Sequence, residues 1–205
     1  MDPSVAGKPE SSTPSKKKII MVGLAASAVL ACLGIWSCAD DDAGKYHAGT
    51  ALRSDDQEGI EVTSPHAQIG KEYWVALPAA ENISGRPLEL LKGEITHAPK
   101  GLEITGYKAF SHEDTQGHPL GATPVEGIPG MPDLTAMRDH SDHPSRIKAH
   151  TYGDIFWAAK VRVTGKISGD LTGCRYFYRQ NESEYEQDLG CVTRIRLGKP
   201  IRIEG

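Results

Sequence analysis

Five of the eight histidines lie in or beside residues 111–144, a segment rich in proline and glycine with little periodicity. Inside it, the run Asp139-His140-Ser141-Asp142-His143 mixes imidazole and carboxylate groups, which are ligand types for zinc and copper. No cysteine and no further ligand at a fixed spacing accompanies the candidate ligands Asp139, His140, Asp142 and His143. A metal site also needs a rigid surrounding shell, and this segment shows no sign of one. We therefore expect a solvated loop and no cofactor, with a zinc or copper site at these four residues as the alternative.

The sequence contains none of the common catalytic motifs. It has no G-x-S-x-G, no H-E-x-x-H and no glycine-rich loop that would cradle a phosphate. Four acidic residues alternate near the C-terminus, at 182, 184, 186 and 188, and we expect them to form an acidic strand edge that discourages aggregation. The sequence therefore predicts a protein without enzymatic activity.

The four cysteines fall into two groups. Cys32 and Cys38 lie inside a long apolar run, and Cys174 and Cys191 lie in the C-terminal part of the chain. Two cysteines alone in an oxidising compartment are expected to form one disulfide. If Glu182-Ser183 is the loop of a hairpin, Cys174 and Cys191 face each other directly, with Cβ atoms about 4.5–5.5 Å apart. A modest local twist then brings the pair within bonding range.

The apolar run Ile19–Ala39 has no charged residue and follows three lysines at 16–18. A helix of about 20 residues spans the roughly 30 Å hydrocarbon layer of a bilayer, whereas the core of a secretory signal has about 7–15 residues. Because a lysine-rich flank stays in the cytoplasm, the sequence predicts a single-pass transmembrane helix with an exported C-terminal part. Two alternatives remain open, namely cleavage before Asp40 and export with a lipid on Cys32 or Cys38.

The apolar run divides the chain into unequal parts. Residues 1–18 have almost no apolar side chain, so we expect a disordered cytoplasmic tail. Residues 40–58 are expected to form an acidic linker and residues 59–205 an extracytoplasmic domain. Removing the four lysines and two acidic residues of the tail from the totals of 23 and 27 leaves 19 basic and 25 acidic residues after position 39, a net charge of −6. An acidic exported part has no basic footprint for nucleic acid, and we expect no such partner.

Short alternations of apolar and polar residues separated by Gly, Pro and Asn are typical of β-strands. The strongest is Asp154–Thr164, whose odd-numbered residues from 155 to 163 share an apolar face. Gly106 interrupts the strand expected at Leu102–Phe110, which indicates a bulge. Asn82-Ile83-Ser84-Gly85 should form a turn, and its first three residues spell an N-glycosylation sequon. The other expected strands are Ile60–Thr63, Glu72–Leu77, Pro87–Leu91, Arg146–His150, Cys174–Gln180, Tyr185–Leu197 and a last short one at Ile201 and Ile203.

About eight short strands, little helix and one disulfide indicate an all-β fold, an antiparallel β-sandwich. The Cys–Trp–Cys pattern of a true immunoglobulin domain is absent, so the fold is immunoglobulin-like only in a loose sense. Most aromatic side chains should lie in the core. Phe177, and whichever of Tyr73 and Trp74 points outward, are the candidates for an aromatic binding face.

Two stretches, YGDIFWAAKVRVTGKISGDLTGCRYFYRQ (Tyr152–Gln180) and YEQDLGC (Tyr185–Cys191), resemble exported or membrane-anchored single-domain proteins of unknown function from actinobacteria. The resemblance implies an exported β domain and no particular activity. We expect a membrane-tethered, non-enzymatic binding or structural module of the cell envelope, which contacts an unknown protein or envelope component through residues 111–144. An exported metal-binding domain that uses the histidine-rich loop is the alternative.

Overall fold

The computed structural model describes residues 45–54, 61–116, 121–127 and 133–199, and these residues form strands and no helix. No helix in this part of the chain is long and apolar enough to cross a membrane. The expected tail, the apolar run with Cys32 and Cys38, and the strand at Ile201 and Ile203 lie outside the described residues. The strands are β1 (His47–Ala48), β2 (Leu52–Ser54), β3 (Glu61–Ala67), β4 (Glu72–Ala76), β5 (Ala80–Asn82), β6 (Leu88–His97), β7 (Leu102–Ser111), β8 (Ala122–Pro124), β9 (Ser145–Ile147), β10 (Thr151–Tyr152), β11 (Ile155–Val163), β12 (Leu171–Gln180) and β13 (Ser183–Leu197).

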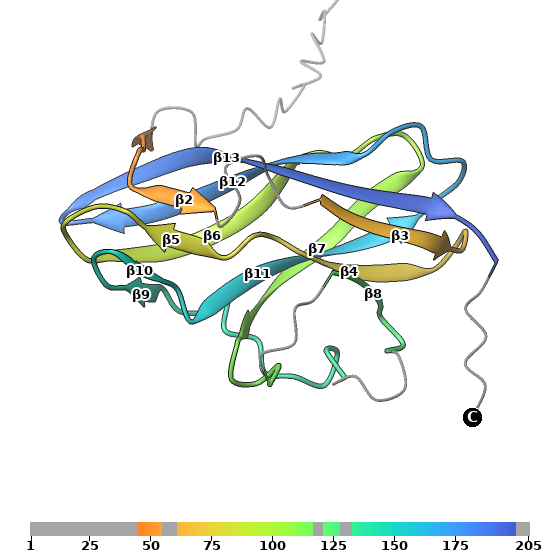
Figure 1. Ribbon diagram of the computed structural model, residues 1–205, viewed down its shortest axis with the longest axis horizontal. Helices are drawn as coiled ribbons and strands as arrows, with labels where there is room; N and C mark the ends of the chain where they lie inside the picture. The colour runs from red at the N-terminus through yellow and green to blue at the C-terminus, as the bar shows by residue number, and fades with distance from the viewer. Residues whose placement is uncertain (1–44, 55–60, 117–120, 128–132, 200–205) are drawn as a thin grey trace, which may run out of the picture. The chain divides into compact units, whose positions relative to one another are not determined.

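The strands form three sheets. The largest has the order β1-β13-β12-β6-β9 with β3 also paired to β13, the second has the order β7-β11-β4-β8, and the smallest has the order β10-β5-β2. In Figure 1, β13, β12 and β6 form one layer and β4, β11 and β7 the layer below it. This arrangement is all-β and consistent with a sandwich, but β1 and β3 run parallel to β13, which the expectation of an antiparallel fold did not include.

The core lies between the two larger sheets. The residues at 157, 159, 161 and 163 of β11 are buried in it, as the alternation of the sequence predicted. On the facing sheet, Gly93 of β6 lies so close to Trp157 that an added Cβ would come within 3.0 Å of the indole ring. The expected bulge in β7 is confirmed, because Lys160 pairs with Gly106 and Val161 with Ile104, which leaves Thr105 unpaired.

The expected linker at 40–58 is wrong for residues 47–54. Ala51 and Leu52 are buried in the main core, and the phenol oxygen of Tyr178 accepts hydrogen bonds from the N–H groups of Thr50 and Ala51 at 3.1 Å each. The side chain of Gln187 both donates to and accepts from the backbone of Leu52. The segment has little strand pattern of its own, and contacts with distant residues hold it in the fold.

The disulfide between Cys174 and Cys191 is present, but the hairpin register differs from the one expected. The turn is Asn181–Glu182, so Gln180 pairs with Ser183 and Cys174 with Leu189. Asn181 has a positive φ of 59°, a conformation that asparagine tolerates better than glutamate or serine does. The expected loop at Glu182-Ser183 is therefore wrong by one residue.

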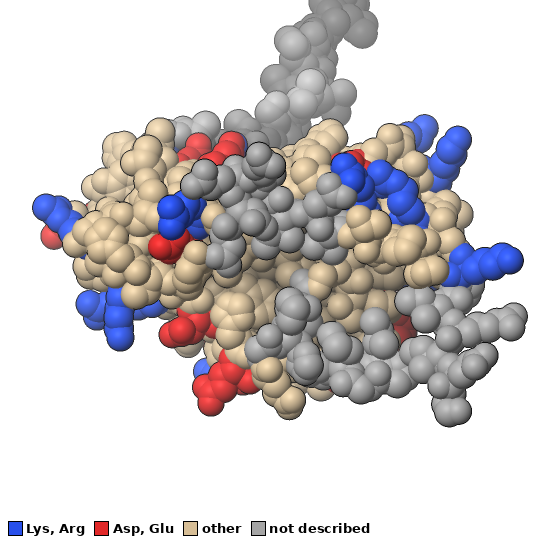
Figure 2. Space-filling model, in the orientation of Figure 1, with Lys and Arg blue, Asp and Glu red and all other residues tan. Residues whose placement is uncertain are grey.

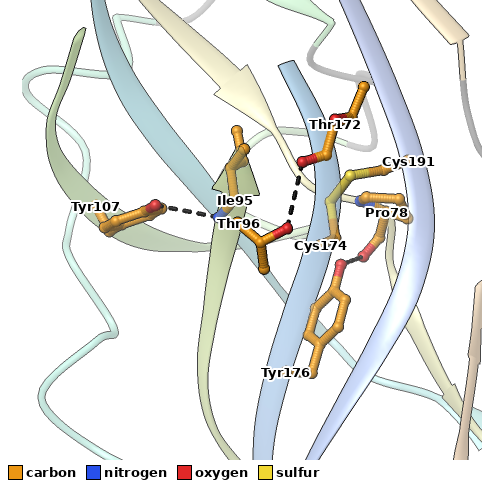
Figure 3. The surroundings of a disulfide bond; sticks show 8 residues. All are labelled: Pro78, Ile95, Thr96, Tyr107, Thr172, Cys174, Tyr176 and Cys191. Carbon is orange, nitrogen blue, oxygen red and sulfur yellow. Dashed lines mark hydrogen bonds between the residues drawn. A yellow bond between two sulfur atoms is a disulfide. The ribbon is translucent and has the colours of Figure 1, made fainter. Parts of the chain in front are cut away.

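An irregularity in the hairpin brings the two cysteines together. Between the pairs Thr172–Val192 and Cys174–Leu189, the two residues Gly190 and Cys191 face the single residue Gly173. Gly173 has a φ of +73°, and a Cβ at this position would lie 2.2 Å from the hydroxyl oxygen of Thr96. The bulge moves Cys191 towards Cys174, so that their Cα atoms are 5.8 Å apart although they are not directly opposite (Figure 3).

Asn82 is a buried hub between β5 and β9. Its side chain is inaccessible to solvent, and its Nδ2 donates to the carbonyl oxygens of Arg86, Ile147 and Lys148 at 2.7, 3.3 and 3.1 Å. Its Oδ1 accepts from both the N–H and the hydroxyl of Ser84, which closes the expected turn. Because the amide is enclosed and fully bonded, the folded protein offers no acceptor for a glycan at this sequon.

Candidate binding surface

The described parts of the long segment at 111–144, residues 111–116, 121–127 and 133–144, cover one face of the fold (Figure 1). Strand β8 of this segment pairs with β4, and Leu134 is buried in a second cluster on the outer side of the β7-β11-β4-β8 sheet. The described parts of this segment lie below that sheet in Figure 1. The other members of the cluster are Trp74, Phe110, Phe156 and Ala158. The expectation of a solvated loop is therefore wrong at β8 and at Leu134, which pair with and pack against the sheet.

The four residues of the histidine–carboxylate run point to different partners. Asp139 accepts hydrogen bonds from the N–H groups of Ala109 and Ser141, and these offset the effect of burial and lower the pKa of its carboxyl. His140 lies 2.8 Å from a carboxylate oxygen of Asp114. Asp142 and His143 are exposed and lie 3.3 Å apart at their nearest nitrogen and oxygen.

The hydrogen bond between the N–H group of Ala109 and Asp139 anchors the segment to β7, and the contact between His140 and Asp114 joins two parts of the segment itself. The hydrogen bond from His140 is the main reason that the pKa of Asp114 lies below its usual range. Among the described residues, no group of three or more His, Cys, Asp or Glu side chains is placed to hold a metal ion. The carboxylate of Asp139 and the ring of His140 serve as internal contacts, which does not favour the metal-binding alternative.

The expectation that whichever of Tyr73 and Trp74 points outward lies at the surface is wrong. Tyr73 is buried in the main core and Trp74 in the cluster beneath residues 111–144, each less than 5% exposed. The two residues alternate across β4 as a strand requires, but the ordered segment covers the outer side as well. Local alternation identifies opposite faces of a strand and cannot reveal that a distant segment covers one of them.

Phe177 occupies the middle of a face that remains accessible. This outer face of the large sheet is formed by alternate residues of β6, β12 and β13, and Phe177 is partly exposed on it. Tyr46 lies beside it with 4.7 Å between ring centroids, and the ammonium of Lys92 is 5.4 Å from the ring. We call this surface the Phe177 face.

Arginine–carboxylate pairs flank Phe177 on both sides along β12. On one side, Arg175 donates to both carboxylate oxygens of Asp188, at 2.7 and 3.0 Å. On the other, Arg179 donates to Glu184 at 2.7 Å. These hydrogen bonds are the main reason that the pKa values of Asp188 and Glu184 lie below their usual range.

The acidic residues of β13 therefore belong to a network of ion pairs in the sheet. The expectation that they form an aggregation-blocking edge is wrong, because β13 pairs with β12 on one side and with β1 and β3 on the other. On the side of the molecule drawn in Figure 2, blue and red side chains lie next to one another at several places on the surface.

We expect the pair between Arg179 and Glu184 to make stability sensitive to acid. Because the pKa of Glu184 is lowered on folding, its contribution is present above the ordinary carboxyl pKa of about 4.3 and is lost as the pH falls through the lower, folded value. Replacing Arg179 by glutamine should flatten the fall in unfolding free energy below about pH 4. Urea titrations at several pH values measure this, and an unchanged slope in the variant would contradict it.

No protein-family model matches the chain, and no curated protein sequence matches it. The arrangement of the described residues therefore carries the functional argument.

Proposed function

We propose that this protein is a membrane-tethered, extracytoplasmic β-sandwich without enzymatic activity that binds a partner in the cell envelope through the Phe177 face. The observation that supports this most is the contrast between the two outer faces. Large apolar side chains on the outer side of the β7-β11-β4-β8 sheet are covered by residues 111–144, whereas Phe177 and Tyr46 on the other sheet stay partly exposed among charged residues. An aromatic centre with a polar rim is typical of protein interaction sites.

The sequence supports the membrane tether. Ile19–Ala39 is long enough to span a bilayer, and the lysines at 16–18 favour a cytoplasmic N-terminus with residues 40–205 outside the cell. Cleavage before Asp40 or a lipid on Cys32 or Cys38 would export the same domain by another route. The disulfide of the domain agrees with an oxidising location.

Site-specific photo-crosslinking in intact cells tests the binding role. A photoreactive amino acid placed at Phe177 of the full-length chain should give a discrete crosslinked adduct. Ile69 is the matched control, because it is an apolar residue that is 62% exposed in the turn between β3 and β4. A third photoreactive position, at Arg138, probes the segment at 111–144. Equal adduct yields at Phe177 and Ile69, or adducts at Arg138 and none at Phe177, would overturn the assignment to the Phe177 face.

A further inference from the structure

A hollow of about 300 Å³ lies at one end of the Phe177 face. Pocket volumes for small molecules begin at about this size, which suits a single sugar ring or an amino acid. The residues around it come from the start of β6, from β9 and from the end of β12 with its turn. They are Pro87, Leu88, Glu89, Arg146, Arg179 and Asn181.

The sheet register places three charged residues of this hollow in one row. Arg179 of β12 pairs with Glu89 of β6, and Glu89 pairs with Arg146 of β9. Residues that face each other across neighbouring strands point to the same side of a sheet, so both guanidinium groups project outward on either side of one carboxylate. On the far side of Arg179, Glu184 of β13 continues the row.

The two arginines differ in how their charge is balanced. Arg179 donates to Glu184 at 2.7 Å and to Glu89 at 3.3 Å, so two carboxylates share its charge. Arg146 is exposed, and its side chain forms no hydrogen bond or ion pair with the residues that the structure describes. A guanidinium has five donors arranged for a carboxylate or phosphate, and all five remain available on Arg146.

The other walls of the hollow fit an anionic ligand. Asn181 has a positive φ of 59° in the two-residue turn, which fixes its backbone beside the two arginines and leaves its side-chain amide exposed. Pro87 contributes an exposed apolar ring without a backbone donor. One unpaired guanidinium, one amide and one apolar wall together match a compact group with an oxyanion attached to a ring or chain.

We infer that this hollow binds an oxyanion, a carboxylate or a phosphate, carried by the partner of the Phe177 face, with Arg146 as the principal anchor. The inference extends the proposed function, since it names the chemistry that the partner presents at one end of that face. Glu89 does not cancel the charge of Arg146, because the two carboxylates of the row, Glu89 and Glu184, are already balanced by Arg179 and by Lys45, whose ammonium lies 3.6 Å from Glu184. The geometry suits the oxyanion of either a carboxylate or a phosphate, and the test measures the binding of each one separately.

Nuclear magnetic resonance of the arginine Nε–Hε groups in the full-length chain tests the inference. Sodium glucuronate and inorganic phosphate are titrated in separate samples, and the Arg146 signal is assigned from Arg146→Lys. We expect a saturable shift of the Arg146 signal and of the Asn181 side-chain amide with at least one of these anions. The anion that binds more tightly identifies the source as a carboxylate or a phosphate.

Two charge-matched variants complete the test. Arg146→Ala should weaken binding at least about tenfold, because it removes hydrogen bonds to a charged group. Arg86→Ala removes the same charge from an exposed residue outside the hollow and should change the dissociation constant less than about twofold. A linear shift without saturation, or equal weakening in both variants, would show only general charge screening and overturn the site. Crosslinking at Phe177 can succeed when this titration fails, so the two proposals fail independently.

Discussion

Replacing Cys174 and Cys191 together by alanine is expected to lower the free energy of unfolding by about 2–4 kcal/mol. The bond closes a loop with a sequence separation of 17, for which the loss of chain entropy in the unfolded state is worth about 3 kcal/mol. Both sulfurs also pack in the main core, where Cys174 is 1% and Cys191 8% exposed. Guanidinium titration of the oxidised parent and the double variant measures the difference.

Reduction provides the control for this prediction. A reducing agent should destabilise the parent by a similar amount and leave the double variant unchanged. The hairpin should nevertheless remain in both, because the disulfide lies beside further hydrogen bonds. The phenol of Tyr176 donates to the carbonyl oxygen of Pro78 at 2.6 Å, and Thr96 donates to the carbonyl of Thr172 at 3.4 Å (Figure 3). Equal stability of the oxidised parent and the double variant would contradict the expected contribution.

The second large effect is expected at Asn82. Asn82→Asp keeps the size of the side chain but replaces the Nδ2 donor by an oxygen that faces three carbonyl groups. Unfolding free energy should fall by about 3 kcal/mol at pH 7, because a buried donor is lost and a charge is left without a partner. Urea titration at pH 7 measures this. A change below about 1 kcal/mol would show that the hydrogen bonds of Asn82 contribute little to the stability of the fold.

The pH dependence of the same variant gives a sharper test. Burial among carbonyl oxygens should raise the pKa of the new carboxyl group above its unfolded value. The protonated form can still donate one hydrogen bond, so the loss of stability should be smaller at pH 4 and grow as the pH rises through the folded pKa. Asn181→Asp is the matched control, since it makes the same exchange at an exposed turn residue and should change stability by less than about 0.5 kcal/mol.

The long strands could be predicted because their signals are local. Three predicted strands correspond to observed ones, with ends that differ by one residue: Glu72–Leu77 to β4, Leu102–Phe110 to β7 and Asp154–Thr164 to β11. The apolar parity of residues 155–163 marks the core face because side chains alternate along any strand. By contrast, β2 and β5 have three residues each and are ordered by backbone pairing with one another. So short a segment shows no readable alternation.

The candidate site was predicted only in part. Phe177 was correctly expected at the surface, because it alternates with the core residues Tyr176 and Tyr178. Trp74, which lies on the outer side of β4, was wrongly expected at the surface because residues from the distant segment 111–144 cover it. The pairing that places Arg146 beside Glu89 could not be predicted, since these residues are far apart in sequence and belong to strands that are not consecutive.

The sequence by itself determined the strand content, the core face of each long strand and the pairing of Cys174 with Cys191. All three follow from residue type and from alternation within a few residues. The tertiary structure alone decided which outer face is covered and where the bulge at Gly173 brings Cys191 to Cys174. These features depend on backbone conformations and contacts that form only when distant strands pack together, where the free energy of the whole sheet outweighs local preference.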